Sequence, residues 1–302
     1  MKHCTGIQAL TDADIDAILS RAQTYADQIN AGQPITTTLN GRIVMNLFFE
    51  NSTRTRTSFE TAALRLGANV INWDVESSSV KKNESFSDTI QTLAEYDPDA
   101  IIIRHSDYGA PDYVASMVKC PVINAGDSWR EHPTQALLDA LTIRQAKGRI
   151  EGLTIAICGD IAHSRVAASN MALLTRLGAT VRVIAPDFLM PEKPLAAGIE
   201  KFTSMESGLP GCDIVMMLRN QKERMDPSRM PSDIAFFNQY GLTAERLDLA
   251  KPDACVMHPG PMNRGVEIAD EVADDPTRSL ILKQVRNGVP VRMAVLDLLI
   301  NR

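Results

Sequence analysis

Apolar residues recur along this chain in two alternating patterns, the spacing of amphipathic helices and the short runs of buried strands. Between Ile15 and Ile29 they follow the helical spacing, and Thr11 and Asp14 stand before them as a capping pair. The mostly apolar run at 42–49 follows an Asn-Gly pair and indicates a buried strand. In the first half of the chain, the patterns predict strands over 42–49, 69–75, 100–104 and 121–124, and helices over 12–29, 57–66, 85–96, 111–118 and 133–147.

The alternation starts again after residues 148–152, a short polar segment with a glycine at each end, which we interpret as a domain boundary. In the second half we expect strands over 154–158, 180–185, 213–218 and 254–258, and helices over 164–177, before Gly208, twice before the last strand, and over 289–300. Alternating strands and helices are typical of parallel sheets with helices on both faces. The sequence therefore predicts the α/β class, with two doubly wound parallel-sheet domains.

Composition and charge narrow the class of protein. The 302 residues are 44% hydrophobic and 23% charged, which is typical of a globular chain of about two domains rather than a fibrous or disordered one. With 31 Lys and Arg against 37 Asp and Glu, the formal net charge is −6. Such a chain is a poor general binder of nucleic acid or anionic membranes. An anionic ligand would have to be bound by cations that are gathered locally.

The five cysteines are scattered and form no CxxC pair, so the sequence predicts neither a disulfide framework nor a zinc site. No apolar run reaches the roughly 18 residues of a membrane-spanning helix. The N-terminus also lacks the apolar stretch of a secretory signal. We therefore expect a cytoplasmic protein.

The polar segment at 50–58 lies between a predicted strand and a predicted helix. Its hydroxyls, its two guanidiniums and the amides of a helix N-terminus are all donors that suit a phosphate. It is not a Walker loop, because it lacks the Gly-x-x-x-x-Gly-Lys spacing. The alternative is a capped helix with surface arginines, but a cap needs only one hydroxyl, so we favour anion binding.

Further candidate residues follow the other predicted strands, where ligands bind in open α/β sheets. Taken singly, each is also compatible with a structural role or a solvated surface. The segment at 159–165 has one glycine only, so the dinucleotide-binding fingerprint fails there. The remaining segments are Ser77–Glu84, Arg104-His105, His132-Pro133-Thr134-Gln135, Arg219–Arg224 and His258–Gly265.

Three motifs together resemble the aspartate/ornithine carbamoyltransferase family: Ser52-Thr53-Arg54-Thr55-Arg56, His132-Pro133-Thr134-Gln135 and His258-Pro259-Gly260-Pro261. The resemblance runs from about Leu47 to the C-terminus. Ornithine-specific members carry Cys-Leu-Pro where this chain has Pro-Gly-Pro, and this difference, with Arg219-x-Gln221-Lys222-Glu223-Arg224, favours the aspartate-using branch. The resemblance implies transfer of a carbamoyl group from carbamoyl phosphate to L-aspartate in pyrimidine biosynthesis, with no cofactor and no metal.

The resemblance also implies roles for individual residues. Carbamoyl phosphate would be bound by Ser52, Thr53, Arg54, Thr55, Arg104, His132, Gln135, Gly260 and Pro261, of which Arg54, Thr55, Arg104 and His132 would be catalytic. L-Aspartate would be bound by Lys82, Arg165, Arg219 and Gln221. Ser78 and Lys82 would come from a neighbouring subunit of a homotrimer with shared active sites, and Glu50, Glu223 and Arg224 would act in domain closure.

The implied mechanism is direct attack of the aspartate amine on the carbamoyl carbon, with fixed donors stabilising the charge on the carbonyl oxygen. We expect a carbamoyl-phosphate domain of residues 1–133 plus 287–302, an aspartate domain of residues 134–286, and the active site in the crevice between them. An ornithine-using relative and a catalytically silent partner chain are the competing interpretations. Whether regulatory chains or a dihydroorotase join the trimer stays open.

Overall fold

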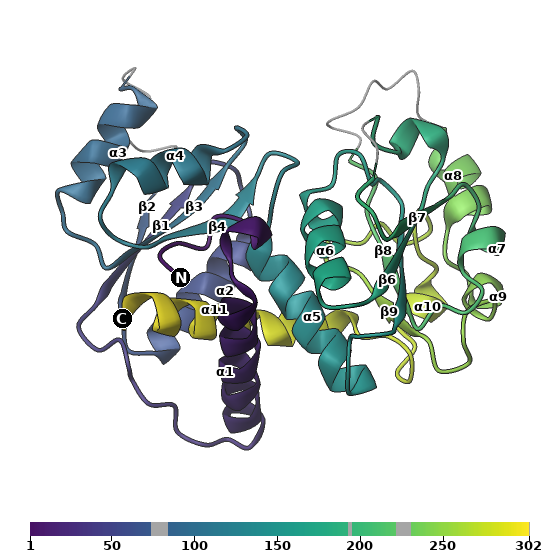
Figure 1. Cartoon of the computed structure of the whole chain (residues 1–302), viewed down its shortest axis with the longest axis horizontal. Coiled ribbons are helices and arrows are strands. Elements are labelled where there is room, and N and C mark those ends of the chain that lie inside the picture. The colour runs from purple at the N-terminus through teal and green to yellow at the C-terminus, as the bar shows by residue number, and fades with distance from the viewer. Residues whose placement is uncertain (74–83, 193–194, 222–230, 302) are drawn as a thin grey trace. The chain divides into compact units, whose positions relative to one another are not determined.

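The computed structural model describes residues 1–73, 84–192, 195–221 and 231–301. The chain divides into two compact units, one of Met1–Leu141 with Arg286–Arg302 and the other of Thr142–Val285. Each unit is built around one parallel sheet (Figure 1). The divisions between the units fall inside two helices, α5 (Pro133–Lys147) and α11 (Ile281–Ile300), so each of these helices contributes to both units.

The first unit contains a four-stranded sheet in the order β2-β1-β3-β4, and every neighbouring pair is parallel. Its strands are β1 (Ile43–Phe48), β2 (Asn69–Trp73), β3 (Ala100–His105) and β4 (Val122–Asp127). Its helices, besides α5 and α11, are η1 (Ile7–Ala9), α1 (Asp12–Asn30), α2 (Thr53–Arg65), α3 (Phe86–Ala94) and α4 (Ala110–Met117).

The apolar pattern explains how these elements pack. Alternate residues of β1 and β3 point to the same face, and Met45, Leu47, Ile101 and Ile103 form one buried cluster with the apolar sides of α3 and α4. Thr11 is the N-cap residue of α1: its side chain accepts from the Asp14 amide, and the Asp14 side chain accepts from the Thr11 amide in return. This reciprocal capping box confirms the predicted start of the helix.

The second unit contains a five-stranded parallel sheet in the order β7-β6-β5-β8-β9. Its strands are β5 (Thr154–Cys158), β6 (Thr180–Ile184), β7 (Ile199–Phe202), β8 (Ile214–Met217) and β9 (Cys255–Met257). Its helices are α6 (Arg165–Arg176), η4 (Asp187–Leu189), α7 (Met205–Gly208), α8 (Asp233–Tyr240), α9 (Ala244–Leu247) and α10 (Asp270–Ala273). The prediction of two α/β units with parallel sheets is confirmed.

One predicted boundary was wrong. Helix α11 begins at Ile281, whereas the sequence pattern predicted its start near Val289. Pro290 instead lies inside the helix, and the turns before it are stabilised by burial of Ile281 and of Gln284. Tertiary packing therefore outweighs the local cost of the proline.

Two segments of the sheets were not predicted. Strand β7 pairs only with β6 at the edge of the second sheet, and its polar Ile-Glu-Lys-Phe sequence carries a weak strand signal. At the N-terminus, the Cys4 amide donates to the Val122 carbonyl at 2.8 Å and the Asn124 amide donates to the Cys4 carbonyl at 2.9 Å, so the chain start runs along β4. Among the described residues, no helix combines the length and the apolar character needed to cross a bilayer.

Candidate active site

The strand orders create one switch point in each sheet, where neighbouring strands are followed by connections that run in opposite directions. In the first sheet it lies between β1 and β3, and in the second between β5 and β8. Ligands of open α/β sheets bind beyond the carboxyl ends of strands at such points. The described candidate residues follow these strands or the adjacent ones: Glu50, Ser52, Thr53, Arg54 and Thr55 after β1, Arg104 in β3, His132 and Gln135 after β4, Arg165 after β5, Arg219 and Gln221 after β8, and Gly260 and Pro261 after β9.

The junction of β1 and α2 has the features of an anion site. Ser52 is the N-cap residue of α2, but its hydroxyl makes no capping hydrogen bond, and the first turn contains no acidic side chain. Thr53 and Arg54 are exposed, whereas Thr55 is buried. The N-terminal amides of a 13-residue helix and an unused cap hydroxyl are donors that suit a phosphate oxygen.

Arg104 links this junction to the neighbouring strands. Its backbone carbonyl accepts from the Phe49 amide at 2.9 Å, directly after β1. Its Nη1 donates to the Ala125 carbonyl at 3.2 Å, and its Nε lies 3.4 Å from Oε2 of Glu50. The guanidinium is therefore held beside the β1–α2 junction. Glu50, expected to act in closure, forms an ion pair with Arg104 within the first unit.

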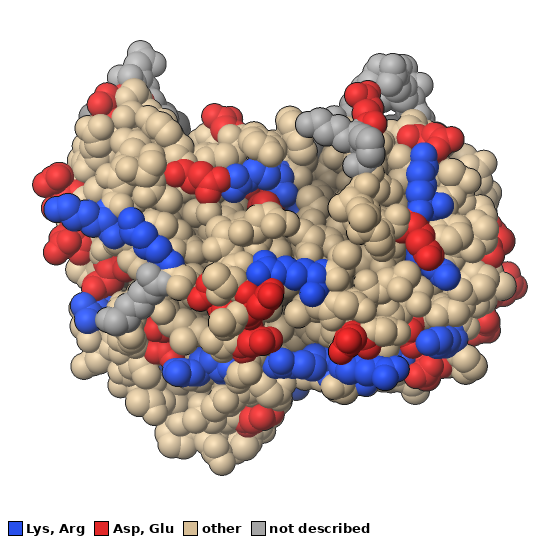
Figure 2. Space-filling view, in the orientation of Figure 1, with Lys and Arg blue, Asp and Glu red and all other residues tan. Residues whose placement is uncertain are grey.

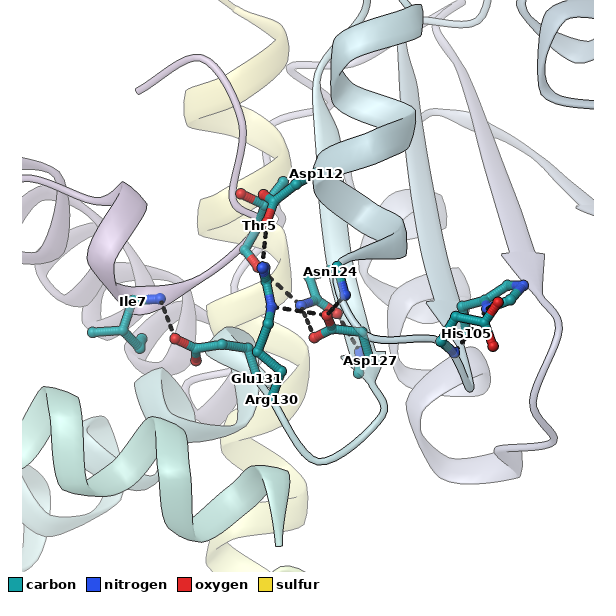
Figure 3. A network of polar contacts seen from close by, with 11 residues as sticks. Thr5, Ile7, His105, Asp112, Asn124, Asp127, Arg130 and Glu131 are labelled. Atoms are coloured by element: carbon teal, nitrogen blue, oxygen red, sulfur yellow. Dashed lines mark hydrogen bonds and ion pairs between the residues drawn. The ribbon is translucent and has the colours of Figure 1, made fainter. Parts of the chain in front are cut away.

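A buried network holds the loop that leads from β4 to His132 (Figure 3). Asp127 is fully buried, and its Oδ1 accepts from the Asn124 side chain at 2.7 Å. Its Oδ2 accepts from the Gly109 amide at 2.9 Å and lies 2.9 Å from Nε of Arg130. Nη2 of Arg130 in turn donates to the Thr5 carbonyl at 3.1 Å. The N-terminal segment and the ends of β3 and β4 are thereby tied together just before His132.

His132 and Gln135 open helix α5. His132 is buried, and its carbonyl accepts a hydrogen bond from the Gln135 amide at 2.9 Å. His132 is therefore the N-cap residue of α5, directly before Pro133. The Gln135 side chain donates through Nε2 to Oδ1 of Asp139 at 3.0 Å. Because a carboxylate only accepts hydrogen bonds, the Nε2 end of the amide must face Asp139, and Oε1 is directed away from it as an acceptor.

Two further cationic or titratable groups lie near these elements. Burial lowers the pKa of His105, against the opposite influence of Asp107 and Glu50, and its ring centroid lies 4.9 Å from that of Phe49. The buried Arg292 has its pKa lowered to about 10 by desolvation, which the charge of Asp139 opposes.

Arg292, on helix α11, packs against helix α2. Its Nη1 donates to the Ser58 hydroxyl at 2.8 Å, and its guanidinium lies 4.9 Å from the centroid of the Phe59 ring. A Cβ on Gly288 would lie 2.6 Å from Nη1 of Arg292, so this glycine makes room for the guanidinium. Arg292 was not predicted from the sequence; the only signal available was an arginine among the apolar residues of 289–296.

In the second unit, the fully buried Asp160 joins the loops that follow β5 and β8. Its Oδ1 accepts from the His163 amide at 3.1 Å and lies 2.9 Å from Nδ1 of the same residue. Its Oδ2 accepts from the Gln221 amide at 3.2 Å. Arg165 is buried as the first residue of α6, whose N-cap hydroxyl, on Ser164, accepts from the Ala167 amide at 3.1 Å. The segments of two predicted aspartate-binding residues, Arg165 and Gln221, thus meet around one carboxylate.

The remaining candidates are placed as follows. Arg219 is half-buried and follows Leu218, the first residue after β8. Gly260 has a φ of +67° and is joined to Pro261 by a cis peptide bond. Four predicted residues, Ser78, Lys82, Glu223 and Arg224, lie outside the described residues.

Charged side chains on one face and metal-binding side chains are distributed over the described residues as follows. On the face drawn in Figure 2, acidic and basic side chains lie interspersed, so its described part presents no extended surface of one sign. Within the described ranges, no three or more His, Cys, Asp or Glu side chains are grouped as metal ligands.

Comparison with known proteins places this arrangement in a family. Residues 2–145 match the carbamoyl-P binding domain of aspartate/ornithine carbamoyltransferases, and residues 151–299 match the Asp/Orn binding domain of the same proteins. The chain therefore belongs to the aspartate/ornithine carbamoyltransferase family.

Individual relatives point to one branch. The aspartate carbamoyltransferase catalytic subunit of Rhodospirillum rubrum is 55% identical over 298 residues, covering 99% of this chain and 93% of the relative. A Trypanosoma cruzi aspartate transcarbamoylase, solved with carbamoyl phosphate and aspartate, has a TM-score of 0.87 at 36% identity and covers 98% of this chain and 96% of its own. The ornithine carbamoyltransferase of Pyrococcus furiosus has a TM-score of 0.90 at 28% identity, covering 99% and 97%. The backbone is thus shared by both branches, while sequence identity is higher with the aspartate-using relatives.

Proposed function

We propose that this chain is an enzyme that transfers the carbamoyl group of carbamoyl phosphate to the amine of L-aspartate, giving N-carbamoyl-L-aspartate and phosphate. The observation that carries the proposal is the 55% identity, over 99% of the chain, to a relative named as an aspartate carbamoyltransferase catalytic subunit. The uncapped, donor-rich start of α2 supports it independently, because it supplies the phosphate-binding chemistry that the reaction requires.

Carbamoyl phosphate is bound through its two ends. Ser52, Thr53, Arg54 and Thr55 bind the phosphate, with Arg104 beside them at the end of β3. The carbamoyl amide is recognised by acceptors, the Oε1 atom of Gln135 and the carbonyls of Gly260 and Pro261. This division follows from the chemistry, since phosphate oxygens need donors and an –NH₂ group needs acceptors.

The chemical step is attack of the deprotonated aspartate amine on the carbamoyl carbon. The C–N bond forms, negative charge develops on the carbonyl oxygen, and the C–O bond to phosphate then breaks while the departing phosphate takes the amine proton. Thr55, Arg104 and His132 donate to the carbonyl oxygen, and loss of one such donor commonly costs about 3 kcal/mol of transition-state stabilisation. No nucleophilic side chain is needed, because phosphate is already a good leaving group.

The acceptor substrate is bound by arginines. Arg165 and Arg219, with Gln221, bind the two carboxylates of L-aspartate, because guanidinium groups bind carboxylates bidentately. Lys82 and Ser78 are contributed by a neighbouring subunit of a homotrimer, and Glu50, Glu223 and Arg224 act in closure. We further place the reaction in pyrimidine biosynthesis in the cytoplasm, where the five free cysteines of the chain would stay reduced.

The test is formation of ureido product from carbamoyl phosphate with L-aspartate and L-ornithine as parallel acceptors. Product with aspartate alone supports the proposal. Product with ornithine alone would retain the phosphate half-site and refute the acceptor assignment. If folded protein formed no product with either acceptor, the catalytic assignment itself would be refuted. Arg54→Ala serves as a control, because it removes a phosphate-binding side chain that is exposed and outside the core.

A further inference from the structure

The turn that follows β9 is bound at both ends by two buried side chains. His258 is 2% exposed and Glu267 is fully buried, and Nε2 of the histidine lies 3.1 Å from Oε1 of the glutamate. The Gly260 amide donates to Nδ1 of His258 at 2.9 Å. The Asn263 amide donates to the same Oε1 atom of Glu267 at 2.6 Å. One side-chain pair thus holds the amide before Pro261 and the amide that closes the turn.

These contacts define the state of the histidine ring. A ring nitrogen that accepts a hydrogen bond carries a lone pair, so the Gly260 amide requires an unprotonated Nδ1. The ring proton is then on Nε2, from which it is donated to the Glu267 carboxylate. The backbone amide of His258 also donates to Oε1 of Gln284 at 2.9 Å. The imidazole is therefore oriented by its backbone and by both ring nitrogens.

The same turn leaves its carbonyls unused. Among the described residues, none donates a hydrogen bond to the Gly260 or Pro261 carbonyl oxygen. Gly260 is half-buried and Pro261 is exposed. Oε2 of Glu267 is buried and has no hydrogen-bond partner in the described part of the chain. A buried carboxylate with one oxygen left unbonded contributes little to stability. The burial of Glu267 therefore points to a role in fixing the geometry of the turn.

We propose that His258 and Glu267 are positioning residues that aim the Gly260 and Pro261 carbonyls at the amide group of carbamoyl phosphate. This inference rests on the proposed function. Neither side chain contacts the substrate: both act through the backbone amides of the turn. Their effect is therefore on recognition of the carbamoyl end and not of the phosphate end, which the start of α2 binds.

Paired substitutions test this role. In His258→Asn, the amide oxygen replaces Nδ1 as acceptor for Gly260, whereas in His258→Gln the longer side chain reaches Glu267 but leaves the Gly260 amide unbonded. Glu267→Gln keeps an Oε1 acceptor for Asn263, and Glu267→Ala removes it. For each variant, KM for carbamoyl phosphate and the inhibition constant of inorganic phosphate are measured, together with the melting temperature.

We expect His258→Gln and Glu267→Ala to raise KM for carbamoyl phosphate about 10-fold, the equivalent of one lost hydrogen bond. The inhibition constant of phosphate should stay within about twofold, and the conservative variants His258→Asn and Glu267→Gln should retain most of the affinity. A merely structural role would lower the melting temperature without changing the ratio of the two constants. An unchanged ratio in folded His258→Gln and Glu267→Ala, with normal wild-type turnover, would overturn the inference and leave the proposed function intact.

A measurement on the wild-type protein covers the case in which a variant does not fold. ¹⁵N NMR of histidine-labelled protein reports which ring nitrogen carries the proton. The His258 signal is assigned as the one that persists when each of the other four histidines is substituted in turn. The neutral form with the proton on Nε2 supports the inference. A proton on Nδ1 would overturn it, because the Gly260 amide could not then be bound. Absence of carbamoyl aspartate from wild-type protein would instead refute the proposed function.

Discussion

Substitution of Gly159 by alanine tests how closely the ends of β5 and β8 must approach. Gly159 has a φ of +118°, and an added Cβ would lie 2.5 Å from the Leu218 carbonyl oxygen, which belongs to the backbone and cannot rotate away. The left-handed conformation costs an L-residue about 1–2 kcal/mol. Overpacking adds about 1–3 kcal/mol, so we expect the free energy of unfolding to fall by about 2–5 kcal/mol.

Gly152→Ala is the matched control, since Gly152 has a φ of +74° but no heavy atom within 4 Å of the added Cβ. It carries the backbone cost without the clash, and both substitutions reduce the entropy of the unfolded chain equally. The assay is urea unfolding of both variants at one protein concentration, because assembly contributes to apparent stability. The difference between the variants reports the clash of Gly159 with Leu218 together with the additional backbone strain of its larger φ.

The same clash has a kinetic consequence. Leu218 directly precedes Arg219, so displacing its carbonyl should raise KM for aspartate more than KM for carbamoyl phosphate. Equal unfolding free energies for Gly159→Ala and Gly152→Ala would refute the packing argument. Equal changes in the two KM values would refute the link to the aspartate-binding segment.

Three further substitutions address the site and the core. Glu50→Ala should lower kcat and weaken aspartate binding, by on the order of 10- to 100-fold if closure positions the substrates; unchanged steady-state kinetics would refute its role in closure. Asp139→Asn provides a donor that lets the Gln135 amide reverse. Acetyl phosphate has a methyl group in place of the amide of carbamoyl phosphate, and we expect the kcat/KM preference for carbamoyl phosphate over it to fall about 10-fold. An unchanged preference would show that Asp139 does not orient the Gln135 amide. Tyr25→Phe removes the hydrogen bond to Oδ2 of Asp297 at 2.8 Å and should cost about 1 kcal/mol near neutral pH. Burial and Asp297 raise the pKa of Tyr25 to about 12, above its ordinary value near 10. The stabilising effect of the Tyr25 hydroxyl is therefore complete below pH 10 and is lost as the pH rises toward 12. If the difference in unfolding free energy between the wild type and Tyr25→Phe grew over that range in urea unfolding, the predicted pH dependence would be wrong.

Local patterns were sufficient where one element could be recognised from its own residues. The capping pair of Thr11 and Asp14 begins α1, and the apolar runs after residue 42 and after residue 153 form β1 and β5. Prediction failed where packing decided the outcome. Helix α11 continues through Pro290 because Ile281, Gln284 and Asn287 in its earlier turns are buried, and β7 is a strand because β6 offers it an edge.

The residues that support the candidate site were harder to predict from the sequence than the candidate residues themselves. Asp139, Arg292 and Glu267 are ordinary residue types inside helical or loop patterns, and only their burial distinguishes them. A charged side chain in a sequence is most often solvated. Their partners lie on the same helix for Asp139, far away in the chain for Arg292 and in the same turn for Glu267, and sequence spacing does not show which of these interactions are made.

The sequence by itself determined the α/β class and the residue types that stand after each strand, because helical and strand periods and the chemistry of hydroxyl, guanidinium and imidazole groups are local properties. The tertiary structure decided which of those strand ends are neighbours. The orders β2-β1-β3-β4 and β7-β6-β5-β8-β9 bring Glu50 to Arg104, and Asp160 to Gln221. Strand order depends on which apolar faces pair across long stretches of chain, and these contacts form only when the whole sheet is assembled.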